Sequence, residues 1–195
     1  MATPRPGVAA LRAEPERLSL LTVGIVLFLG SELMFFAALF AMYFTLRSQA
    51  GAWPPPGTNL DLLEPSIFTA VLVSSSGSMQ MAVRSIRSGD RRAMRRWILV
   101  TMLLGIVFLG GQAHGYAKAN FDIASSAYGS AFYTMTGFHA LHVFAGLILM
   151  IVLLGRAAAG AYSPEDHAGV EVAAYYWHFV DVVWIGLYSA IYLIK

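Results

Sequence analysis

Five long apolar segments determine what this sequence can fold into. A helix needs about 20 residues to cross the hydrocarbon core of a bilayer, and no water there satisfies backbone groups left outside a helix. Hydrophobic residues make up 57% of the chain and charged residues 12%. The sequence therefore predicts an all-α polytopic membrane protein whose single domain, 18–195, is a bundle of five transmembrane helices. The expected spans lie at about 18–46, 66–86, 97–117, 128–154 and 171–194.

The connection between the second and third segments sets the expected orientation. Residues 84–96 contain six arginines around a Gly89-Asp90 turn. Because cytoplasmic loops carry an excess of Lys and Arg, we expect this connection and the polar N-terminal tail, 1–17, on the cytoplasmic side, and the C-terminus outside. We also expect the arginines to attract anionic lipid head groups. They are Arg84, Arg87, Arg91, Arg92, Arg95 and Arg96.

Composition narrows the function. The chain has no cysteine, which excludes disulfides, thiolate metal sites and covalent c-type haem attachment. The net charge is +2, but the arginines flank apolar segments, as membrane topology requires, so we expect no nucleic-acid partner. No internal repeat is visible, which argues against a secondary transporter built from two related halves.

The last apolar segment carries a polar stripe. Glu171, Tyr175, His178 and Asp181 recur at helical spacing, so they share one side of a helix that is otherwise compatible with lipid. Ionisable groups are costly among acyl chains, and such a stripe must face protein, water or lipid head groups. We therefore expect a partner surface for it elsewhere in the chain, and we assign these four residues to an intramembrane polar network.

Three more polar residues join the predicted network. Glu32 lies deep in the first segment, where a carboxyl group must be protonated or paired. Proton handling and a simple helix–helix hydrogen bond both remain open for it. His139 and His142 stand on adjacent turns of the fourth segment and could ligate a metal or haem, but we favour helix–helix hydrogen bonds because no further histidine set appears. We expect Glu32 to hydrogen-bond a histidine or tyrosine of the fourth or fifth segment, His178 or His139 in preference.

Other features point to packing and to the membrane interface. Trp53 is expected at the interface, where aromatic side chains are enriched, and Trp177 and Trp184 are expected to serve both packing and interface anchoring. The serines at 74–78 let another backbone approach closely, and they show neither the elbow nor the base of a serine hydrolase. We expect no catalytic residue and no metal on this chain.

Five motifs closely resemble cytochrome c oxidase subunit III. They are SELMFF at 31–36, WPPPG at 53–57, AYGSAFY at 127–133, GFHALHV at 137–143 and AYYWHFVDVVWIGLY at 174–188. The resemblance covers essentially everything from Leu18 onward, in the family's order and spacing. By position, Glu32 matches the family's buried carboxylate, His139 and His142 match its paired histidines, and Glu171, His178 and Asp181 match its last-helix polar set.

The resemblance implies a function. It implies a non-redox core subunit of a respiratory haem-copper oxidase in the bacterial cell membrane, packed against oxidase subunits I and II. That complex transfers electrons from cytochrome c to oxygen and pumps protons. By the same resemblance, the haem and copper belong to the partner subunits, while this chain stabilises the catalytic subunit, supports proton uptake and binds structural phospholipid. Membership of a respiratory supercomplex stays open.

Two departures and two rivals accompany the resemblance. The longer family form has seven spans around a lipid-filled cleft, and this chain corresponds to the last five. The family's Gln-Ala-x-Glu-Tyr run reads here as Gln112-Ala113-His114-Gly115-Tyr116, without the carboxylate. The first rival is subunit III of a quinol oxidase, which tends to have Asp in place of Glu32. The second is a free-standing lipid-binding or proton-conducting helical bundle.

Overall fold

All regular structure in the described part of the chain is helical. The computed structural model describes residues 20–58 and 61–194, so the predicted tail at 1–17 lies outside it. Each expected apolar segment contains one long helix, and a short π-helix, η1, continues the last one. The helices are α1 Leu20–Gln49, α2 Leu63–Arg87, α3 Arg91–Lys118, α4 Ala127–Ala158, α5 Ala168–Tyr188 and η1 Ser189–Leu193.

Local sequence explains where several helices begin. Gly89 adopts a φ of 83°, a left-handed conformation that glycine tolerates without strain, and it separates α2 from α3. Asp90 then caps α3, because its side chain accepts hydrogen bonds from the backbone N–H groups of Arg92 and Ala93. Ser126 caps α4 in the same way by accepting from the Gly129 N–H. The Gly89-Asp90 turn predicted from the sequence is therefore confirmed.

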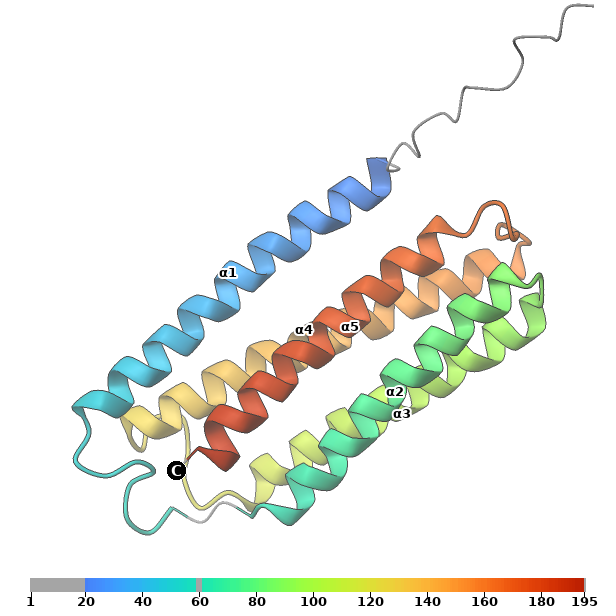
Figure 1. Ribbon diagram of the computed structural model, residues 1–195. Coiled ribbons are helices and arrows are strands. Elements are labelled where there is room, and N and C mark those ends of the chain that lie inside the picture. Colours follow the sequence, from blue (N-terminus) through green and yellow to red (C-terminus); the bar gives the residue numbers. More distant parts are fainter. Residues whose placement is uncertain (1–19, 59–60, 195) are drawn as a thin grey trace, which may run out of the picture.

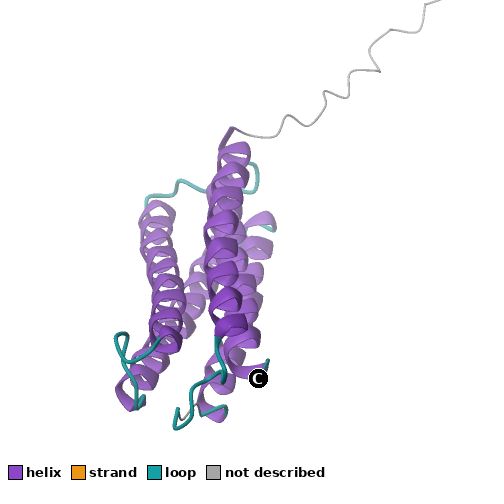
Figure 2. Cartoon of the chain, turned by 90° about the vertical axis from the view of Figure 1, so that its left-hand side faces the viewer, coloured by secondary structure: helices purple, strands orange, loops and turns teal. Residues whose placement is uncertain are grey.

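The helices run side by side along one axis, with connections at two ends (Figure 2). One layer contains α1, α5 and α2, with α5 in the middle, and α4 and α3 lie behind it (Figure 1). We call the end with the α2–α3 turn and the α4–α5 connection the arginine end. The opposite end carries the α1–α2 and α3–α4 connections and η1. There the Asn120 side chain donates a hydrogen bond to the Gly57 carbonyl at 2.7 Å.

The core surrounds α5. The indole ring of Trp177 is fully buried, and it lies so close to Gly105 of α3 and Gly146 of α4 that a Cβ at either position would come within 2.8 Å of the ring. Two glycines thus provide the space for the largest side chain of the core. By contrast, α1 lies at the periphery, and only its Phe36 and Tyr43 side chains are buried.

Four of the five long helices meet the requirements for crossing a membrane. Among the described residues, α1 to α4 are long and apolar enough to do so. The fifth helix, α5, is not among these four, and it carries Glu171, His178 and Asp181. It has neighbours on several sides, since α1, α2 and α4 all pack against it. Its polar side chains can therefore find protein partners.

Candidate functional site

Glu32 and His142 connect α1 to α4. Glu32 Oε2 lies 2.9 Å from His142 Nε2, and both side chains are mostly buried. The other ring nitrogen, Nδ1, lies 2.7 Å from the Phe138 carbonyl oxygen, one turn earlier in α4. The Tyr176 hydroxyl of α5 donates a hydrogen bond to the His142 carbonyl at 3.0 Å. Three helices therefore meet at this pair.

The geometry of this pair defines where its protons can be. A carbonyl oxygen can only accept, so His142 Nδ1 must carry a hydrogen. A further proton between Nε2 and Glu32 Oε2 completes the hydrogen bond, either as a carboxylic acid that donates to imidazole or as imidazolium that donates to carboxylate. Both arrangements leave the pair with no net charge. The pair can therefore hold one proton and pass it between two atoms.

The polar stripe of α5 finds its partner on α2. Ser76 Oγ lies 2.9 Å from His178 Nδ1 and donates a hydrogen bond to Asp181 Oδ2. Because the single hydroxyl hydrogen goes to Asp181, the His178 Nδ1–H must donate to Ser76. His178 Nε2 lies 3.4 Å from Gln80 Oε1, one turn along α2. We call Ser76, Gln80, His178 and Asp181 the α2–α5 cluster.

The α2–α5 cluster contains a serine, a histidine and an aspartate, but it lacks the geometry of a hydrolase triad. In a triad the imidazole lies between the hydroxyl and the carboxylate, so that it can remove the hydroxyl proton. Here Ser76 lies between His178 and Asp181 and donates its proton to the carboxylate. Asp181 Oδ1 is buried and has no hydrogen-bond partner among the described residues. The cluster can accept or relay a proton, and it does not activate a nucleophile.

Glu171 belongs to a separate group at the arginine end. Arg87 donates to Glu171 Oε1 through Nη2 at 2.6 Å and through Nε at 3.1 Å. His167 Nε2 lies 3.1 Å from the same oxygen. Tyr175 is 45% exposed, and no hydrogen bond joins it to another described residue. The stripe predicted from the sequence is thus divided, and Glu171 is an ion-pair partner of the arginine-rich segment.

His139 has no polar partner. It is fully buried, and neither ring nitrogen has a hydrogen-bond partner in the described part of the chain. Its ring lies edge-on to Phe108, with centroids 5.8 Å apart, and 4.8 Å from the Trp184 ring. The expectation that His139 makes a helix–helix hydrogen bond is wrong, because aromatic rings surround it. Among the described residues, no group of three or more His, Asp or Glu side chains could hold a metal.

The family of this chain follows from its sequence as a whole. The family model for cytochrome c oxidase subunit III matches residues 16–195. The chain belongs to the cytochrome c oxidase subunit III family. The motifs at 31–36 and 174–188, which carried the resemblance, hold the paired Glu32 and the α5 half of the α2–α5 cluster.

Members of the subunit III family match this chain over nearly their whole length. A protein of Nocardia farcinica described as a probable cytochrome c oxidase subunit 3 is 47% identical over 92% of this chain and 91% of its own length. Cytochrome c oxidase subunit 3 of Corynebacterium diphtheriae is 44% identical over 100% of this chain and 96% of its own. The subunit of Thermostichus vulcanus is 41% identical over 88% and 86%.

The partner that we preferred for Glu32 from the sequence is wrong, although the class of partner is right. Glu32 pairs with a histidine of the fourth segment, as predicted, but that histidine is His142. His178 instead faces α2, and His139 lies against Phe108 of α3. The two histidines of α4, three residues apart, therefore contact different helices.

Two tryptophans assigned to the interface are core residues. Trp177 and Trp184 are buried, and their indole N–H groups donate to Ser75 Oγ and Thr69 Oγ1, each at 2.9 Å. Hydroxyl groups of α2 satisfy both indoles, which is why they can leave the membrane surface. Trp53 is half-buried at the end opposite the arginines, where its ring lies edge-on to Tyr43 and Tyr128.

Sequence reasoning missed the polar role of α2. Ser75 accepts the hydrogen bond of Trp177, and Ser76 and Gln80 form the α2 half of the α2–α5 cluster. The signal was present, because four serines and a glutamine occur within seven residues of an apolar segment. We had interpreted these residues only as small side chains that allow close packing. In an apolar helix, hydroxyl and amide groups also hydrogen-bond across helices.

Proposed function

We propose that this chain is the non-redox subunit III of a bacterial cytochrome c oxidase, held in the cell membrane beside oxidase subunits I and II. Those partners carry the haem and copper, transfer electrons from cytochrome c to oxygen and pump protons. The observation that carries the proposal is the family match over residues 16–195, together with relatives named as this subunit that match over 91% and 96% of their own length.

The proposed topology has five membrane crossings in one domain. Two features support α5 as the fifth crossing: it lies between α1 and α2 and runs the length of the bundle (Figure 1). The arginine end faces the cytoplasm, because six arginines gather in 84–96. With five crossings, the N-terminus then lies inside and the C-terminus outside.

The surface of α1 is the proposed contact with the catalytic subunit. Only Phe36 and Tyr43 of this 30-residue helix are buried, whereas Leu27 and Met34 are 71% and 75% exposed. A helix with one buried stripe and a broad apolar surface suits a partner helix or lipid. The Glu32–His142 pair and the α2–α5 cluster fix the orientation of α1 and α5, and we propose that they support proton uptake by keeping protons in defined positions.

The arginine end is the proposed contact with anionic lipid. Arg92, Arg95 and Arg96 surround a surface hollow with Leu99, while Arg87 is neutralised by Glu171. Juxtamembrane arginines attract anionic head groups by about 1 kcal/mol each. Trp53, at the other end, is the proposed interfacial anchor.

Two rival functions remain testable. A quinol oxidase subunit would share the fold, but the relatives are named as cytochrome c oxidase subunits. A free-standing bundle would need no partner, and the relatives named as subunits of an oxidase argue against it.

Deletion of the gene that encodes this chain tests the proposal. We expect oxidase activity with reduced cytochrome c to become short-lived during turnover, and we expect the intact chain to restore its lifetime. Activity and lifetime that stay unchanged would contradict the proposal. A deficit seen only with quinol as the donor would favour the first rival.

A further inference from the structure

One outer surface of the bundle carries polar side chains at membrane depth. On α5, Tyr175 is 45% exposed and His178 is half-buried, while Gln80 of the neighbouring α2 is half-buried beside His178. The helices α2 and α5 lie side by side (Figure 1), so these side chains belong to one surface. We call it the polar face, and it comprises Ser74, Gly77, Gln80, Tyr175, His178 and Val182.

The polar groups of this face lie below the membrane surface. The ion pair between Arg87 and Glu171 marks the arginine end of α2 and α5. Gln80 and His178 each lie two helical turns from that pair along their own helices, which places them about 11 Å deeper. With the proposed topology, the lipid head groups at the arginine end therefore leave these two side chains among acyl chains or against protein.

Two of these side chains have unused hydrogen-bonding capacity. Gln80 makes a single contact with described residues, 3.4 Å from its Oε1 to His178 Nε2, so its two amide N–H groups have no partner among them. The Tyr175 hydroxyl likewise has none in the described part of the chain. Acyl chains offer no hydrogen-bonding group, and polar side chains inside a membrane usually face protein or a water-filled cavity.

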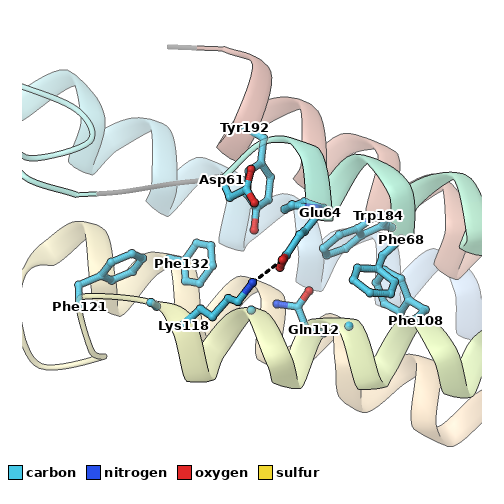
Figure 3. A pocket seen from close by; sticks show the side chains of 14 residues that line it. Asp61, Glu64, Phe68, Phe108, Gln112, Lys118, Phe121, Phe132, Trp184 and Tyr192 are labelled. Carbon is cyan, nitrogen blue, oxygen red and sulfur yellow. Dashed lines mark hydrogen bonds and ion pairs between the residues drawn. The ribbon is translucent and has the colours of Figure 1, made fainter.

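The other outer surfaces differ at the same depth. The exposed residues of α3 between 99 and 110, and those of α4 between 138 and 152, are all apolar or glycine. At the end opposite the arginines, charged side chains beside a cavity pair with each other, as Glu64 does with Lys118 (Figure 3). The surfaces of α3 and α4 thus suit lipid, whereas the polar face needs a partner that forms hydrogen bonds.

The polar face also allows a close approach. Ser74 and Gly77 are exposed on one side of α2, and a Cβ at Gly77 would have no atom within 4 Å. The Ser74 hydroxyl bonds only the Ala70 carbonyl of its own helix. Small residues at such positions let the backbone of a second helix come near, and hydrogen bonds between side chains then join the two helices.

We propose that the polar face binds a membrane-spanning helix of another oxidase subunit. The helix packs on Ser74 and Gly77, and it carries a hydroxyl or amide side chain that accepts a hydrogen bond from the Gln80 amide. This contact is additional to the one proposed for α1. The inference rests on the proposed function, because it requires that the chain is part of an oxidase complex.

Photochemical crosslinking tests the proposal without disturbing the contact. The photoreactive residue benzoylphenylalanine replaces Val182, which is 66% exposed on the polar face. Ile148 of α4 is the matched control, because it is 49% exposed on an apolar surface and also lies in the middle of its helix. Native membranes are irradiated, the tagged chain is isolated with its complex, and the crosslinked peptides are identified by mass spectrometry.

We expect position 182 to crosslink to a co-purifying oxidase subunit, within a membrane-spanning segment that contains a hydroxyl or amide side chain. Position 148 should give no product with protein. The proposal would be overturned by the absence of a protein product at 182, by equal products at both positions, or by a product with a second copy of this chain. If oxidase subunits co-purify but 182 gives no product with them, the oxidase function stands while the docking surface fails.

A second experiment blocks the polar face with a larger side chain. Gly77→Leu and Gly110→Leu each add a bulky group at an exposed glycine with no atom within 4 Å of a Cβ, but Gly110 lies on the apolar surface of α3. We expect both variants to accumulate equally in the membrane. After detergent washing, Gly77→Leu should retain several-fold less of the crosslinked subunit than Gly110→Leu does. Equal retention would contradict the assigned surface.

Discussion

At Glu32, the replacing side chain determines whether His142 Nε2 keeps a hydrogen-bond partner. Glu32→Gln can still donate an amide N–H to this nitrogen, whereas Glu32→Ala cannot. A buried acceptor without a partner costs about 1–3 kcal/mol. We therefore expect the alanine variant to lower the melting temperature of the purified complex clearly and the glutamine variant to lower it little. Equal loss in both variants would mean that the carboxyl charge, and not the hydrogen bond, is what matters.

At Ser76, one hydroxyl group serves both His178 and Asp181. Ser76→Ala leaves the imidazole N–H and the carboxylate without their shared partner, and we expect a loss of about 1–3 kcal/mol in stability. Ser74→Ala is the control, since Ser74 is exposed and its hydroxyl bonds only the Ala70 carbonyl of its own helix. Thermal unfolding of the two variant complexes distinguishes the cases. Similar melting temperatures for both would show that the α2–α5 cluster does not hold the helices together.

The sequence predicted which residues need partners better than it predicted the partners. The length of the first apolar segment and the position of Glu32 within it indicate that its carboxyl group needs a partner. In the structure that partner is a histidine of the fourth segment, one of those expected. The choice of His142 over His139 depends on how α4 is rotated against α1 and α3. That rotation results from the packing of the whole bundle, and the spacing of residues along a single helix carries no information about it. The sequence did not predict the role of Ser76, because a serine side chain is both small and polar.

At the scale of the helices, α5 is held by close packing of Trp177. A Cβ at Gly146 of α4 would come within 2.8 Å of the Trp177 ring, so Gly146→Ala must displace the indole or the helix. Overpacking of this kind costs about 1–3 kcal/mol. Gly137→Ala, in the same helix with open space at its Cβ, should be neutral or slightly stabilising. Chemical or thermal denaturation of both complexes measures the difference, and a neutral Gly146→Ala would contradict the packing described here.

At the scale of the whole molecule, the distribution of charge sets the orientation. The chain contains no cysteine, so a single introduced thiol reports its own position. We expect Ala52→Cys to react with a membrane-impermeant maleimide added to intact cells, since it lies in the α1–α2 connection. Glu165→Cys, at the arginine end, should react only after the membrane is opened. The reverse pattern would contradict the proposed orientation, and labelling of both from outside would contradict three crossings by α2, α3 and α4 between the two positions.

The proposal that this chain is an oxidase subunit has a decisive test. The chain is isolated from its native membrane through an affinity tag, and the visible spectrum and the subunits of the preparation are recorded. We expect that a haem-bearing catalytic subunit and a copper-bearing subunit accompany the chain, and that the preparation consumes oxygen with reduced cytochrome c. A colourless preparation that contains this chain alone would contradict it.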